Sequence, residues 1–200
     1  RVFPSPSLFV QKLRDVCSTT LTRDFWDITL PSQLATSAAR SPSLFAYLAG
    51  LVKLGATALF SKVKIGDLVD PSVVGSKSQI ERHHLFPKAY LESLGVKDLR
   101  ETNQIANFAW LEWPDNLKIG AEAPSVYVPE LDSELRGEVR KRAYEWHALP
   151  PLWWNLPYSE FLAQRRLLIA HVIEHAWLTL LGKSELSTPA VSIADLISAG

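Results

Sequence analysis

IERHHLFPKAYLESLG, residues 80–95, places two adjacent histidines, His83 and His84, between a short charged run and an apolar pair. The segment from Gln79 to Phe86 suits a short β-strand, and Pro87 marks its end. Successive side chains of a strand point to opposite faces. The two histidines can therefore serve one site only where the strand ends and the chain bends.

The residues that follow predict the rest of a small motif. Lys88 to Leu94 suits one or two helical turns that end at Gly95. NQIANFAWLEW, residues 103–113, has the aromatic and apolar spacing of a second, half-buried strand. Beyond Pro114, residues 115–119 can open a short helix. The local order is strand, insert, strand, helix.

Helices are expected on both sides of this motif. One should cover residues 7–22 with Ser7 as its N-cap, and a buried one should begin at Ser41 with Pro42 in its first turn. Two more should begin at Asp132 and at Ser159, the last with Ser159 as its cap. The tryptophans of the connector ALPPLWWNLP should pack in the core. The segment APSVYVPEL reads as a turn of the chain.

These elements predict a mostly α-helical, α+β protein. It divides into an N-terminal helical part, a central part that carries the histidines, and a C-terminal helical part that packs on the centre. The expected bounds of these parts are residues 1–65, 66–131 and 132–200.

Composition narrows the class of protein. Lys and Arg number 21, as do Asp and Glu, so any contact with a polyanion has to be local. Cys17 is the single cysteine, which excludes an internal disulfide and fits a reducing compartment. Since no apolar run is long enough to span a membrane, we expect a soluble, cytoplasmic protein. The chain contains no methionine, and we expect it to be a piece of something longer.

Two asparagines complete a set of groups that can do chemistry with the histidines. Asn107 lies in the second expected strand, and Asn116 at the start of the short helix. A neutral imidazole and an amide oxygen can hold a divalent cation, while a second imidazole takes a proton from water near neutral pH. This is the outline of a hydrolytic site.

The segments HHLFP, NQIANFAWL and PDNLKIG resemble the three parts of an HNH (ββα-metal) nuclease. Asn107 lies 23 residues after His84, and Asn116 lies nine residues after Asn107. More closely, ERHHLFPKAYLE, NQIANFAWLEWPDNLKI and PSVYVPEL resemble the C-terminal nuclease half of GmrSD-like, modification-dependent restriction proteins. The central part, residues 66–131, is then the nuclease core.

The resemblance implies a role for each candidate residue. His84 would be the general base, His83 and Asn116 would be metal ligands, and Asn107 would fix the loop and orient His84. Hydrolysis would leave a 5′-phosphate and a 3′-hydroxyl. The implied contacts to DNA phosphates are Lys118, Lys88 and Arg82.

The resemblance also implies a cofactor and partners. Mg²⁺ is the expected metal; Mn²⁺, Ni²⁺ or Zn²⁺ stay open because His83 stands where many HNH sites have Asp. Leu117 stands where an arginine often follows the last asparagine. The expected substrate is DNA, cut in antiviral defence. The expected partner is an N-terminal NTP-binding, ParB-like domain or subunit that this chain does not contain. No membrane partner is expected.

Two alternatives stay open. The first is a degenerate HNH module that binds DNA or another partner without cleavage. The second is a zinc metallopeptidase, because HVIEH places His171 and His175 on one helical face with Glu174 as the would-be base. The basic runs RGEVRKR (136–142) and QRR (164–166) are solvated helix faces, or a phosphate-tracking rim where they flank the metal site.

Overall fold

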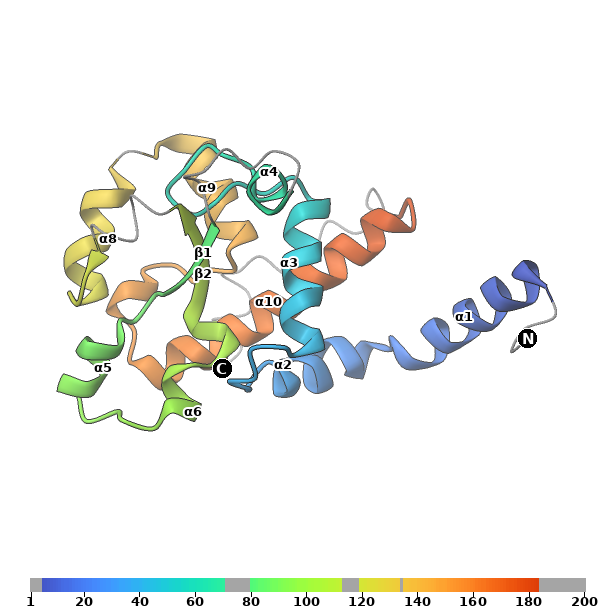
Figure 1. Ribbon diagram of the computed structural model, residues 1–200, viewed down its shortest axis with the longest axis horizontal. Helices are drawn as coiled ribbons and strands as arrows, with labels where there is room; N and C mark the ends of the chain where they lie inside the picture. The colour runs from blue at the N-terminus through green and yellow to red at the C-terminus, as the bar shows by residue number, and fades with distance from the viewer. Residues whose placement is uncertain (1–4, 71–79, 113–118, 134, 184–200) are drawn as a thin grey trace.

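A computed structural model describes residues 5–70, 80–112, 119–133 and 135–183 (Figure 1). The described part of the chain is mostly helical, with one small antiparallel sheet. The sheet pairs β1 (Ile80–His84) with β2 (Phe108–Glu112). It lies in the middle of the body, and helices surround it (Figure 1). The predicted fold class is confirmed.

The chain begins with helices α1 to α4, which precede the sheet. Their bounds are α1 Pro6–Thr20, α2 Leu30–Gln33, α3 Pro42–Lys53 and α4 Ile65–Val69, with a π-helical turn at Phe25–Thr29. Helix α3 starts as predicted, because Ser41 Oγ accepts from Ser43 N–H and Pro42 occupies the first turn. The predicted cap of α1 is wrong by two residues. Ser5 Oγ, instead of Ser7, accepts from Leu8 N–H.

Between the strands lie α5 (Lys88–Ser93), α6 (Leu99–Thr102) and a 3₁₀ turn at Ile105–Asn107. Gly95, at φ +86°, follows α5 as expected. The second strand begins at Phe108, later than predicted, because Asn103 ends α6 and Ile105–Asn107 form a 3₁₀ turn. Asn107 N–H bonds to Gln104 O at 2.8 Å, which tightens the backbone into that turn. The expected helix at 115–119 lies outside the described residues except for Ile119.

The C-terminal helices are α8 (Pro124–Asp132), α9 (Gly137–Trp146) and α10 (Tyr158–Leu180). The predicted turn at APSVYVPEL is wrong, because Pro124 opens a helix there. The predicted cap of α10 is also wrong. Pro157 precedes the helix, which already contains Ser159. Helix α9 begins five residues after the predicted start at Asp132.

Helix α10 packs along α3 and so joins the N-terminal and C-terminal parts directly (Figure 1). Their close approach depends on Gly50, since a Cβ there would lie 3.3 Å from the Cβ of Ala176. Helix α1, by contrast, projects away from the body and has no buried residue (Figure 1). No helix in the described part of the chain is both long enough and apolar enough to cross a membrane.

Aromatic side chains fix the end of β1 in the core. Phe86 packs against Phe161 of α10, Tyr158 and Trp153, with ring centroids 4.8, 5.2 and 6.0 Å apart. Trp153 is fully buried, as expected for the tryptophan-rich connector. Burying this much aromatic surface stabilises the fold by several kcal/mol, at roughly 25 cal/mol per Å² of apolar surface removed from water. The segment just beyond the two histidines is thereby held in place.

Candidate functional site at the end of the hairpin

The register of the hairpin separates the two adjacent histidines. His84 lies opposite Phe108, and His83 lies opposite Ala109. Directly paired residues share a face of the sheet, so the two imidazoles start from opposite faces. His83 is 9% exposed, whereas His84 is half-buried. The strand ends at His84, two residues before the predicted end at Phe86.

His84 is held by two side chains. Its Nε2 lies 2.9 Å from Oδ1 of Asn103, and its ring lies 4.4 Å from the ring of Phe108, centroid to centroid. Burial lowers the pKa of His84 to about 4, and the charges of Lys88, His83 and Arg82 act in the same direction, while the bond to Asn103 opposes them. At neutral pH His84 is therefore an uncharged imidazole that can accept a proton.

Two predicted phosphate contacts lie near this imidazole. Arg82 is exposed two residues before His84, and its guanidinium carbon lies 5.2 Å from the centroid of the Phe108 ring. Arg82 and His84 therefore share one face of the hairpin and one aromatic platform. Lys88 is exposed at the first turn of α5. The structure thus brings Arg82, His84 and Lys88 together.

Asn107 is fully buried, and its amide binds the loop that follows β1. Oδ1 accepts from Phe86 N–H at 2.9 Å, while Nδ2 donates to the carbonyls of Phe86 at 3.1 Å and Thr102 at 3.0 Å. The predicted role of Asn107 in fixing the loop agrees with these contacts. The side chain that hydrogen-bonds to His84 is that of Asn103.

Asn116, the second predicted metal ligand, and Lys118, the third predicted phosphate contact, both lie outside the described residues. In the described ranges, no group of three or more His, Cys, Asp or Glu side chains could hold a metal ion. Of the two predicted ligands, the structure therefore places His83 alone. A histidine nitrogen is an ordinary donor for Mn²⁺, Ni²⁺ or Zn²⁺ and a less usual one for Mg²⁺.

Two buried side chains from α8 and α10 brace the segments just after β1 and just before β2. Tyr127 of α8 donates its hydroxyl to Leu85 O at 2.6 Å. Arg165 of α10 is fully buried and donates to Ala106 O at 2.6 Å and to His147 O at 3.0 and 3.2 Å. The expectation that the run QRR is a solvated face is therefore wrong for Arg165.

Sequence reasoning missed Asn103, Tyr127 and Arg165 as contributors to this site. Asn103 stood within the quoted NQIAN segment, but only Asn107 had the spacing of the motif. Tyr127 and Arg165 stood within the quoted PSVYVPEL and QRR segments, but neither pattern indicated their partners, which are backbone carbonyls 42 and 59 residues away in the chain.

The competing HVIEH segment lies on α10. Glu174 accepts from Arg23 Nη1 at 3.2 Å, and His171 Nε2 lies 3.7 Å from Asp27 Oδ1. His175 is exposed. Glu174, the base in the peptidase alternative, is thus paired with the Arg23 guanidinium, which also binds Asp27.

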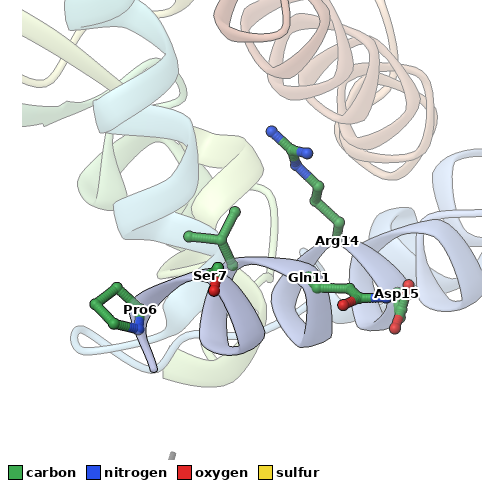
Figure 2. A pocket seen from close by; sticks show the side chains of 6 residues that line it. Pro6, Ser7, Gln11, Arg14 and Asp15 are labelled. Atoms are coloured by element: carbon green, nitrogen blue, oxygen red, sulfur yellow. The ribbon is translucent and has the colours of Figure 1, made fainter. Parts of the chain in front are cut away.

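Two hollows in the described surface lie away from the hairpin. The described lining of the first, about 540 Å³, belongs to α1 alone, where Arg14 points away from the helix (Figure 2). The second, about 580 Å³, lies between α1 and the end of α10, with Leu13, Trp26 and Trp177 in its wall. Neither contains a candidate residue of the HNH motif, but Glu174 of the HVIEH segment lies in the wall of the second.

Comparisons with protein-family models, curated proteins and solved structures find no match to this chain.

Proposed function

We propose that this chain is a metal-dependent HNH endonuclease that hydrolyses phosphodiester bonds of DNA. The observation that carries the proposal is the placement of His84. It is a neutral imidazole at the end of a β-strand, fixed by Asn103 and Phe108 and flanked by the cations Arg82 and Lys88. A proton acceptor beside paired cations suits a phosphodiester substrate.

In this proposal His84 takes a proton from a water molecule while the water oxygen forms a bond to phosphorus. The bond from phosphorus to O3′ breaks, and the oxygen leaves with the electron pair and is protonated by solvent. A 5′-phosphate and a 3′-hydroxyl result. Arg82 and Lys88 bind non-bridging oxygens of neighbouring phosphates and hold the backbone against the hairpin.

The proposed metal ligands are His83 and Asn116. A divalent cation bound there would polarise a non-bridging phosphate oxygen and stabilise the negative charge on the leaving O3′ oxygen. Mg²⁺, Mn²⁺, Ni²⁺ and Zn²⁺ are the candidates. His83 supplies an imidazole nitrogen one residue before β1 ends, and its side chain starts from the face of the sheet opposite to that of His84.

The biological setting is part of the same proposal. The chain would be the nuclease portion of a modification-dependent, antiviral restriction protein in the cytoplasm. Recognition of the modified base would reside in an NTP-binding, ParB-like domain or subunit outside this chain.

The test is a plasmid-nicking assay with Mg²⁺, Mn²⁺ and Ni²⁺ on plain and base-modified DNA. His84→Ala should lower metal-dependent nicking by about 10²- to 10⁴-fold, as loss of a general base does. His175→Ala is the matched control, because it removes an exposed histidine from the competing motif and should leave the rate unchanged. Nicking that survives in His84→Ala and is lost in His175→Ala would refute the HNH proposal. DNA binding without nicking under every condition would favour the degenerate module.

A further inference from the structure

We propose that Asn103 is a positioning residue that makes Nδ1 of His84, and not Nε2, the atom that accepts the proton from water. The inference rests on the proposed function, since it assigns an atom to the role of His84. It starts from one hydrogen bond between side chains 19 residues apart in the chain.

The chemistry of the two groups decides which nitrogen is free. An amide oxygen can only accept a hydrogen bond, so Nε2 at 2.9 Å from Asn103 Oδ1 has to carry the hydrogen in neutral His84. In a neutral imidazole the other nitrogen, Nδ1, then holds the lone pair. Because Nε2 is committed to Asn103, Nδ1 is the nitrogen left to act as a base.

The ring of Phe108 restricts the movement of the His84 imidazole on one side. Its ring lies 4.4 Å from the imidazole at an interplanar angle of 49°, and the Arg82 guanidinium occupies the same aromatic platform at 5.2 Å. A bond at one ring atom and an aromatic wall beside the ring restrict rotation about both side-chain torsions. A proton acceptor held in this way keeps its orientation before the substrate binds.

Asn103 can serve as a fixed point because contacts independent of His84 hold its backbone. It ends α6, with its N–H bonded to Leu99 O at 3.0 Å. Just before it, the Thr102 carbonyl accepts from Asn107 Nδ2 at 3.0 Å. The acceptor oxygen is therefore placed by the fold.

The first test reads the tautomer directly. Long-range ¹H–¹⁵N spectra of the His84 ring at neutral pH should show a single form that carries its hydrogen on Nε2. In Asn103→Ala the Nε2–H signal should be lost to solvent exchange, and a population protonated on Nδ1 should appear. Asn103→Asp keeps an acceptor oxygen and should retain the Nε2–H form. If the wild-type protein carries the hydrogen on Nδ1, the Asn103 amide must face His84 with its Nδ2 and not with Oδ1. This result would overturn the inference.

The second test uses the nicking rate. Asn103→Ala should lower kcat by about 10- to 100-fold with an unchanged metal requirement, as expected when a reacting group loses its orientation. Gln104→Ala is the matched control, since its amide binds Arg166 and not His84, and it should change kcat by less than about threefold. In a His84→Ala background, Asn103→Ala should have no further effect, because Asn103 acts through His84.

The outcomes separate the two proposals. Wild-type protein that nicks, His84→Ala that does not, and Asn103→Ala that nicks at the wild-type rate would overturn the inference and keep the nuclease. Wild-type protein that never nicks would overturn the proposed function, and the ring spectra would still decide the role of Asn103.

Discussion

The side chain of Asn107 hydrogen-bonds both backbone polar groups of Phe86. Its Oδ1 accepts from the N–H at 2.9 Å, and its Nδ2 donates to the carbonyl at 3.1 Å. Next to this pair, the Asn107 carbonyl accepts from Leu85 N–H at 2.8 Å. Hydrogen bonding thus continues past His84 and Phe108, the last paired residues of the sheet. The Asn107 side chain fixes the residues that follow His84 through their backbone.

Asn107→Ala should lower the free energy of unfolding by about 2–4 kcal/mol. It removes the amide partners of Phe86 and Thr102 and leaves buried backbone groups without hydrogen bonds. Urea denaturation measures the change. Asn103→Ala removes one half-buried bond and should lower the free energy by about 1 kcal/mol or less. Equal losses in the two variants would contradict the bracing role of Asn107.

Arg165→Met should destabilise the protein by about 2–4 kcal/mol and loosen the turn that carries Asn107. The carbonyls of Ala106 and His147 lose their hydrogen-bond donors. The substitution also removes the cost of burying a charged guanidinium, which is the reason that burial lowers the pKa of Arg165, but we expect the lost hydrogen bonds to outweigh this gain. Thermal unfolding and hydrogen exchange at residues 105–107 measure the two effects. A variant as stable as the wild type would mean that the cost of desolvating Arg165 cancels its hydrogen bonds.

His147 should make stability fall as the pH drops. Its Nε2–H donates to Thr57 O at 2.9 Å, and burial lowers its pKa to about 4. Since an unfolded histidine has a pKa of about 6.5, the unfolded chain alone takes up this proton between about pH 6.5 and 4. The stabilisation is therefore complete above about pH 6.5 and is lost as the pH falls through that window.

The control for this pH dependence is His147→Gln, which can still donate to Thr57 and does not titrate. Its free energy of unfolding should fall less steeply from pH 6.5 to 4 than that of the wild type. A smaller slope should remain, because the half-exposed His84 also has a lowered pKa. Identical slopes in the two proteins would show that His147 is protonated in the folded state.

Arg82→Gln and Lys88→Gln should each weaken DNA binding and reduce its dependence on salt. Each proposed phosphate contact releases one counterion, so the slope of log K against log salt should become shallower by about 0.9. The assay is fluorescence anisotropy with inactive His84→Ala protein. Lys12→Gln, which removes the same charge from the projecting helix α1, is the control and should leave the slope unchanged. Equal effects of all three substitutions would mean that binding follows net charge alone.

Local patterns predicted the elements of the hairpin well. The strand through His83 and His84, the short helix after Pro87 and the glycine that ends it all depend on near neighbours in the chain, and the structure confirms them. The predicted start of the second strand at residue 103 was wrong, because a 3₁₀ turn at Ile105–Asn107 is closed by a backbone bond that alternation of apolar residues does not reveal.

By itself, the sequence determined which chemical groups are present and where the first strand and most of the longer helices form, since both depend on residue type and short-range spacing. Only the tertiary structure decided that Asn103 contacts His84, that Tyr127 and Arg165 hold the surrounding loops, and that burial keeps His84 neutral. These contacts join segments far apart in the chain. Their energies depend on the water excluded when those segments pack, which no local pattern encodes.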